Sequence, residues 1–157
     1  MGLARDAVDG AIKVIASAMV AAIFLITLAQ VVLRYVFSIA LPWSAEAAQI
    51  LLVYTVMLVA AYAAGRGSHF TVTAIVDLLP ARVRPWLAIV QRLLVAAFAL
   101  VAIVYGTRLA MGQMGSRLPA LRMPVGMVYM ALPIGAVITL FYALIGPRER
   151  AVASPGV

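Results

Sequence analysis

The stretch RGSHFTVTAIVDLLPARVRP, residues 66–85, decides the fold because charge returns here between extended apolar runs. It divides the chain into two pairs of hydrophobic segments. Its apolar residues follow the i, i+3, i+4, i+7 spacing of an amphipathic helix: Val72, Ile75, Val76 and Leu79. We predict a helix over residues 70–79 that lies on a membrane surface, flanked by Arg66, Arg82 and Arg84. A polar loop is the alternative.

The composition identifies an integral membrane protein. Of the 157 residues, 66% are hydrophobic and 11% are charged, and the mean hydropathy is +1.13, whereas about 25% of residues are charged in soluble domains. The net charge of +7 does not indicate nucleic acid binding, because the arginines stand at the ends of apolar runs. With no cysteine and one histidine, we expect no disulfide, no metal cluster and no cofactor.

The apolar segments predict an all-α integral membrane domain with four transmembrane helices, arranged as two hairpins joined by a cytoplasmic amphipathic helix. The expected spans are residues 11–34, 45–65, 86–113 and 125–146, followed by a loose tail over residues 147–157. The first uncharged run is longer than the apolar region of a signal peptide and ends at Arg34, so we interpret it as an anchor. Together these segments predict a compact four-helix body.

Local residues predict how two of the spans begin and bend. Ser44 is placed to cap the second helix, which would start near Ala45. Pro133 removes a backbone donor inside the fourth span, and Gly135 lies close by, so we predict a kink between Tyr129 and Pro133.

The distribution of Lys and Arg predicts the orientation in the membrane. Eight of these residues fall on one side: Arg5, Lys13, Arg66, Arg82, Arg84, Arg92, Arg148 and Arg150. Four fall on the other: Arg34, Arg108, Arg117 and Arg122. The bias predicts cytoplasmic termini and a cytoplasmic central stretch. There Arg66, Asp77, Arg82 and Arg84 would form an in-plane brace that contacts lipid headgroups.

The chain carries no recognisable site for catalysis or ion coupling. All five acidic residues fall at span ends or outside the spans, and no phosphate-binding loop, HExxH or GxSxG motif is present. Gln30 and Gln49 lie about one turn inside their spans, where interhelical hydrogen bonding or reach to the interface is favoured over substrate contact. Arg34 and Glu46 either form an ion pair or anchor separately at the interface. These features indicate a non-catalytic accessory subunit.

Four motifs in order carry a family resemblance: QVVLRYVF (residues 30–37), LPWSAE (41–46), RGSHFTV (66–72) and PALRMPVGMVYMALPIG (119–135). Together they resemble the small membrane subunit of tripartite ATP-independent periplasmic (TRAP) transporters, the DctQ-like family. The match covers roughly Val14 to Leu144. Ala45 departs from the family pattern, which usually offers a second acidic residue beside Glu46.

The resemblance implies a bacterial or archaeal inner-membrane protein that works with a large membrane subunit and a periplasmic substrate-binding protein. The small subunit would widen the scaffold of a sodium-driven importer of small organic acids. Five residues on the outer side then become candidates for docking the binding protein: Arg34, Trp43, Glu46, Arg117 and Arg122. Two alternatives remain open, an autonomous small exporter and a membrane anchor or assembly factor without a role in transport.

Overall fold

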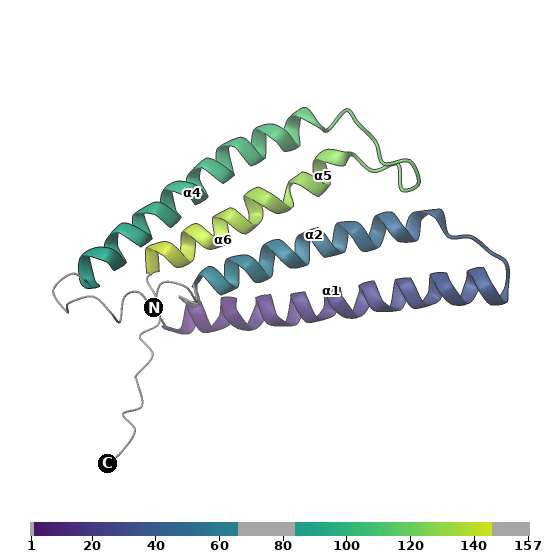
Figure 1. Ribbon diagram of the computed structural model, residues 1–157, viewed down its shortest axis with the longest axis horizontal. Helices are drawn as coiled ribbons and strands as arrows, with labels where there is room; N and C mark the ends of the chain where they lie inside the picture. The colour runs from purple at the N-terminus through teal and green to yellow at the C-terminus, as the bar shows by residue number, and fades with distance from the viewer. Residues whose placement is uncertain (1, 66–83, 146–157) are drawn as a thin grey trace, which may run out of the picture.

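The computed structural model describes residues 2–65 and 84–145. Their elements are helices, in the order α1 (Gly2–Val36), α2 (Pro42–Gly65), α4 (Arg84–Gly112), α5 (Val125–Tyr129) and α6 (Ala131–Ile145) (Figure 1). The predicted amphipathic helix at 70–79 and the tail at 147–157 lie outside the described residues. Within these residues, an isolated bridge between Arg117 and Pro124 is the only β pairing.

Four segments are long and apolar enough to cross a membrane. They are Asp6–Val36, Pro42–Ala64, Ile89–Gly112 and Val125–Leu144. The last of them contains both α5 and α6. The predicted class, an all-helical protein with four membrane-spanning helices, is therefore confirmed.

The helices stand in a row in the order α1, α2, α6, α4 (Figure 1). α1 packs on α2, α2 packs on α6, and α6 packs on α4, so the compact body expected from the sequence is wrong. Lipid tails are as apolar as leucine, and hence no hydrophobic force closes a row of membrane helices into a bundle. Large side chains stay uncovered as a result, with Phe24 64% exposed and Phe98 71% exposed.

Glycines allow the neighbouring helices to approach closely. A Cβ atom on Gly126 of α5 would lie 2.2 Å from the carbonyl oxygen of Ala110 in α4. A Cβ atom on Gly135 of α6 would lie 3.1 Å from the Cβ of Met57 in α2. Small residues at these crossings permit the close backbone packing that joins membrane helices.

The fourth span is interrupted as the sequence predicts. α5 ends at Tyr129 and α6 begins at Ala131, because Pro133 has no N–H with which to continue the helical ladder. Next to this break, the hydroxyl of Tyr54 in α2 donates to the carbonyl of Met127 over 2.7 Å. The break between α5 and α6 falls within the interval where the sequence predicts a kink, and α2 supplies a hydrogen bond to the short helix before it.

The start of α2 differs from the prediction. The helix begins at Pro42, whose fixed φ suits the first helical position. Ser44 is fully buried inside the first turn, and its hydroxyl donates to the carbonyl of Leu41 over 2.6 Å. Ser44 therefore does not cap the helix from outside, and that prediction is wrong.

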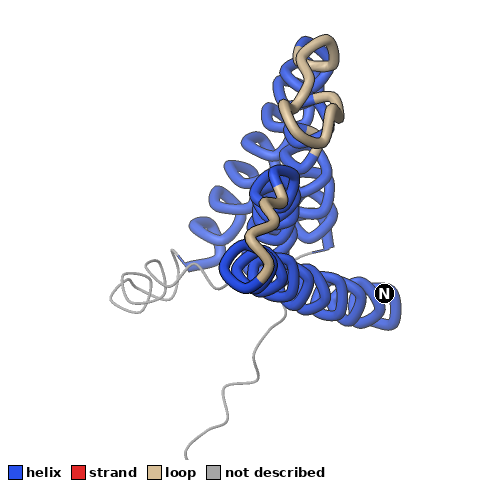
Figure 2. The backbone as a smooth tube through the Cα atoms, turned by 90° about the vertical axis from the view of Figure 1, so that its right-hand side faces the viewer, coloured by secondary structure: helices blue, strands red, loops and turns tan. Residues whose placement is uncertain are grey.

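The molecule has two distinct ends. Residues 37–41 and 113–124 lie at one end, which we call the connector end and which faces the viewer in Figure 2. The opposite end, where α1 begins and α6 ends, is called the terminal end.

Candidate functional site

Glu46 joins α2 to the loop at the connector end through hydrogen bonds. It lies in the second turn of α2 and is half-buried. Its Oε1 accepts a hydrogen bond from the backbone N–H of Ala120 over 2.9 Å, and its Oε2 accepts one from Leu121 over 2.8 Å. A carboxylate that accepts two backbone N–H groups forms charge-assisted bonds, which are stronger than neutral ones. One side chain thereby fastens the 113–124 loop to α2.

The same loop is also ordered by its own hydrogen bonds. The backbone N–H of Leu118 donates to Met123 O over 2.9 Å, and that of Arg122 donates to Leu118 O over 3.0 Å. The Nη1 of Arg117 donates to the Arg122 carbonyl over 3.2 Å. Arg122 has a φ of 55°, a left-handed conformation that a non-glycine residue adopts only when its surroundings require it.

The five candidate docking residues fall into two groups. Glu46 lies against the loop that carries Arg117 and Arg122, and the two arginines are themselves linked through a main-chain carbonyl. Arg34, in the last turn of α1, and Trp43, in the first turn of α2, are both exposed. Arg34 and Glu46, both described residues, form no ion pair with each other; this favours separate anchoring of the two charges.

The two glutamines stand apart from this network. Gln30 is half-buried in α1, and Gln49 is exposed in α2 one turn beyond Glu46. Within the described part of the chain, neither side chain forms a hydrogen bond. Their role as contacts between helices stays a prediction.

The terminal end contains a polar contact that the sequence did not reveal. Asp9 is 5% exposed, and its Oδ1 accepts a hydrogen bond from the hydroxyl of Tyr142, which is 3% exposed. Lys13 lies nearby on α1, with its Nζ 5.8 Å from the centre of the Tyr62 ring. In the sequence, this contact could have been suspected because Asp9 lies little more than one turn before the first uncharged run.

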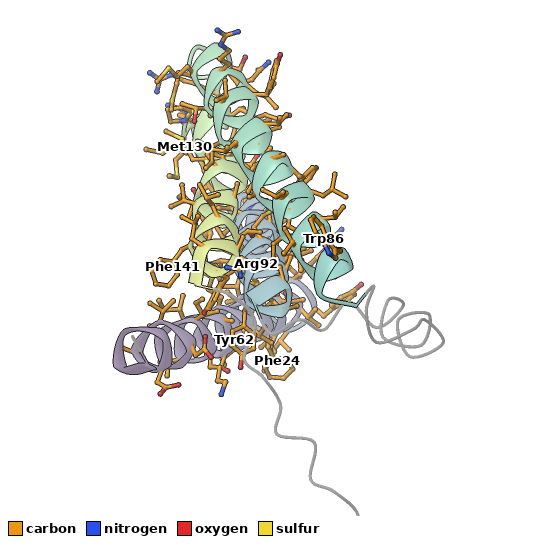
Figure 3. All side chains as sticks on the ribbon, turned by 90° about the vertical axis from the view of Figure 1, so that its left-hand side faces the viewer. Phe24, Tyr62, Trp86, Arg92, Met130 and Phe141 are labelled. Carbon is orange, nitrogen blue, oxygen red and sulfur yellow. The ribbon has the colours of Figure 1, made fainter. Side chains whose placement is uncertain are left out.

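A second contact at this end joins α4 to α6. The Nε and Nη2 of Arg92 donate to the carbonyl of Ala143 over 3.1 and 2.9 Å, and Nη2 also donates to Leu144 O over 3.0 Å. Figure 3 shows Arg92 between these two helices. A cation at a helix C-terminus satisfies carbonyls that have no partner within the helix.

Most of the in-plane brace predicted for the central stretch lies outside the described residues. Arg66, Asp77 and Arg82 lie outside the described residues, and Arg84 is described only as the first residue of α4. Their contact with lipid stays a prediction.

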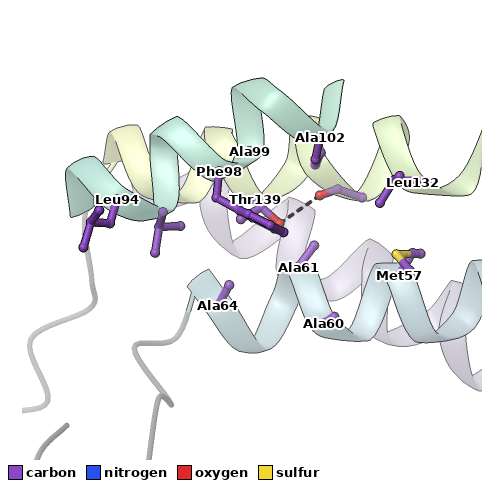
Figure 4. A pocket seen from close by; sticks show the side chains of 13 residues that line it. Met57, Ala60, Ala61, Ala64, Leu94, Phe98, Ala99, Ala102, Leu132 and Thr139 are labelled. Atoms are coloured by element: carbon purple, nitrogen blue, oxygen red, sulfur yellow. Dashed lines mark hydrogen bonds between the residues drawn. The ribbon is translucent and has the colours of Figure 1, made fainter. Parts of the chain in front are cut away.

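An apolar groove runs along one face of the row. A cavity of about 370 Å³ lies between α2 and α4 over α6, lined by Ala61, Phe98, Thr139 and other residues (Figure 4). A second cavity of about 430 Å³ shares Met57 and Leu132 with the first and extends to Glu46 and Gln49. The groove therefore reaches from the terminal half of α2, at Ala64, to the connector end, at Glu46.

The threonine hydroxyls inside the described spans are satisfied within their own helices. The hydroxyls of Thr27, Thr55, Thr107 and Thr139 each donate to the carbonyl four residues earlier. Over residues 2–65 and 84–145, no three His, Asp or Glu side chains come together as possible metal ligands. The described residues therefore provide an apolar contact surface and exposed arginines.

A comparison with protein families identifies the chain. The family described as "Tripartite ATP-independent periplasmic transporters, DctQ component" matches residues 23–149. The chain belongs to the DctQ family. This DctQ protein is a component of a TRAP transporter and, with its four apolar helices, a multi-pass membrane protein. The resemblance carried by the four sequence motifs is thus confirmed. No curated protein matches the chain.

Proposed function

We propose that this DctQ protein is a non-catalytic scaffold subunit of a secondary, sodium-gradient-driven importer of small organic acids. It would act with a large membrane subunit and a periplasmic binding protein. Membership in the DctQ family supports a transporter component. The row of helices supports the scaffold role, since it leaves large apolar side chains uncovered that another membrane body could cover.

The exposed side chains support this reading. Apolar residues are uncovered on the outer helices, including Leu25 at 61%, Leu93 at 65% and Phe98 at 71%. The described spans hold no cluster of acidic side chains in their middle, where ion coupling would require ionisable groups. The sites for substrate and sodium would accordingly lie on the large subunit.

We assign the connector end to the periplasm and both termini to the cytoplasm of a bacterial or archaeal inner membrane. The excess of Lys and Arg toward the terminal end supports this orientation. The two hairpins, α1 with α2 and α4 with α5–α6, would be joined by the cytoplasmic helix at 70–79. Arg66, Asp77, Arg82 and Arg84 would brace that helix against lipid headgroups.

The periplasmic docking surface would comprise the residues that gather at the connector end: Arg34, Trp43, Glu46, Arg117 and Arg122. Three exposed arginines on this end suit a partner with negative charge, because charges at the rim of an interface steer association.

Purification from native membranes tests the proposal. A tagged copy of this chain, extracted in mild detergent, should carry with it a much larger polytopic membrane protein in a fixed stoichiometry. Recovery of the chain alone, or only as a homo-oligomer, from membranes that contain the large subunit would overturn the scaffold assignment.

A further inference from the structure

We propose that Glu46 is a positioning residue: it holds the loop at 113–124 in the conformation that presents Arg117 and Arg122 to a carboxylate-bearing surface of the binding protein. This inference rests on the proposed function and changes the part that Glu46 plays in it. Glu46 would act through the loop, without itself touching the partner.

Glu46 contacts the loop at 113–124 through both oxygens of its carboxylate. Both oxygens of Glu46 are engaged by consecutive backbone amides, those of Ala120 and Leu121, at 2.9 and 2.8 Å. These two amides lie between Arg117 and Arg122 in the chain. Fixing them therefore fixes the turn on which both arginines are mounted.

The described residues at the connector end carry more positive than negative charge. Among the described residues, Glu46 is the only acidic side chain at this end, whereas Arg34, Arg117 and Arg122 are all exposed there. Because the Glu46 carboxylate faces loop amides, it forms no ion pair with these three described arginines. Arg117 donates one N–H to the Arg122 carbonyl and keeps its other donors for a partner.

The order of the loop favours a protein partner over lipid. Three backbone hydrogen bonds join loop residues 116–126 to one another, and Arg122 is held at a φ of 55°. A fixed spacing of two guanidinium groups suits a fixed pattern of carboxylates on a folded surface. Lipid headgroups diffuse freely and require no such arrangement.

Hydrogen exchange tests the positioning step without any transport assay. In the purified protein, Glu46→Gln replaces one acceptor oxygen by an amide donor, so one of the two amides, Ala120 or Leu121, loses its acceptor and should exchange about tenfold faster. A swap variant, Glu46→Gln with Gln49→Glu, keeps the net charge and moves the carboxylate to a position that makes no hydrogen bond to the loop. It should exchange as fast as Glu46→Gln. Unchanged exchange in Glu46→Gln, or full recovery in the swap, would overturn the positioning role.

A double-mutant cycle in vesicles that contain the whole transporter tests the docking step. The measured quantity is the concentration of binding protein that gives half-maximal uptake. Arg117→Ala with Arg122→Ala should raise it roughly threefold or more. Adding Glu46→Gln to that variant should change it no further, because the effect of Glu46 passes through these arginines.

Three other outcomes would each contradict part or all of the inference. If Glu46→Gln has the same effect with and without the arginines, Glu46 contacts the partner directly and the inference is wrong. If the arginine variant binds normally while loop exchange still depends on Glu46, the docking surface is refuted and only the internal contact stands. If the loss depends on the anionic lipid content of the vesicles, the partner is the membrane, and the inference is equally wrong.

Discussion

The hydroxyl of Tyr142 in α6 donates a hydrogen bond to Oδ1 of Asp9 in α1, which ties together helices two places apart in the row. Both side chains are buried, with 3% and 5% of their surface exposed. α1 otherwise packs on α2. This contact therefore fixes the terminal end of α1 against the middle of the molecule.

Removal of the Tyr142 hydroxyl should destabilise the protein. Tyr142→Phe keeps the ring but leaves the buried Asp9 carboxylate without this donor, at a cost of about 1–3 kcal/mol. The midpoint of thermal unfolding in detergent should fall. Tyr105→Phe, at a site 64% exposed, is the control and should leave it unchanged. Equal midpoints for the two variants would show that the contact does not hold α1.

The crossing of α4 and α5 should tolerate no side chain at Gly126. Gly126→Ala places a Cβ 2.2 Å from the Ala110 carbonyl oxygen, so the backbones must separate. Overpacking of this kind costs about 1–3 kcal/mol, and the yield of monodisperse protein should fall with the unfolding midpoint. At Gly112, where a Cβ would meet nothing within 4 Å, alanine should be neutral. A Gly126→Ala protein as stable as Gly112→Ala would contradict this packing.

Arg92 should stabilise the end of α6 through its hydrogen bonds. Arg92→Met keeps an apolar stem but removes all donors to the carbonyls of Ala143 and Leu144. We expect a loss of about 1 kcal/mol and faster amide exchange in the last turn of α6. Arg108→Met, at an exposed position on the same helix, is the matched control. Unaltered exchange in α6 would show that these bonds contribute nothing.

The orientation can be measured because the chain lacks cysteine. A single Ser116→Cys change places a thiol on an exposed residue of the connector end. It should react with an impermeant maleimide added outside intact cells, whereas Ser154→Cys should react only after the cells are opened. The reverse pattern would place the connector end in the cytoplasm.

Features that depend on local chemistry were predictable from the sequence. Pro133 lacks an N–H, and together with the nearby Gly135 it predicts the break that separates α5 from α6. Long runs without charge likewise predict the four spans, since their length and composition are local properties. The membrane class needed no knowledge of which helix packs on which.

Features that depend on pairing between distant residues were not predictable. Glu46 bonds to amides 74 and 75 positions away, and Asp9 contacts a residue 133 positions away. Neither partner can be identified without knowing that α2 meets the loop or that α6 approaches α1. The order of the row was also hidden, because a side chain that faces lipid is as apolar as one that faces a helix.

The central claim is that this chain supports transport by a larger membrane subunit without transporting anything itself. The most direct test is the initial rate of sodium-driven organic acid uptake into vesicles that contain the large subunit, with binding protein outside. Uptake should need both membrane chains together, and vesicles with this chain alone should show none. Full uptake by the large subunit without this chain, or uptake by this chain alone, would contradict the account.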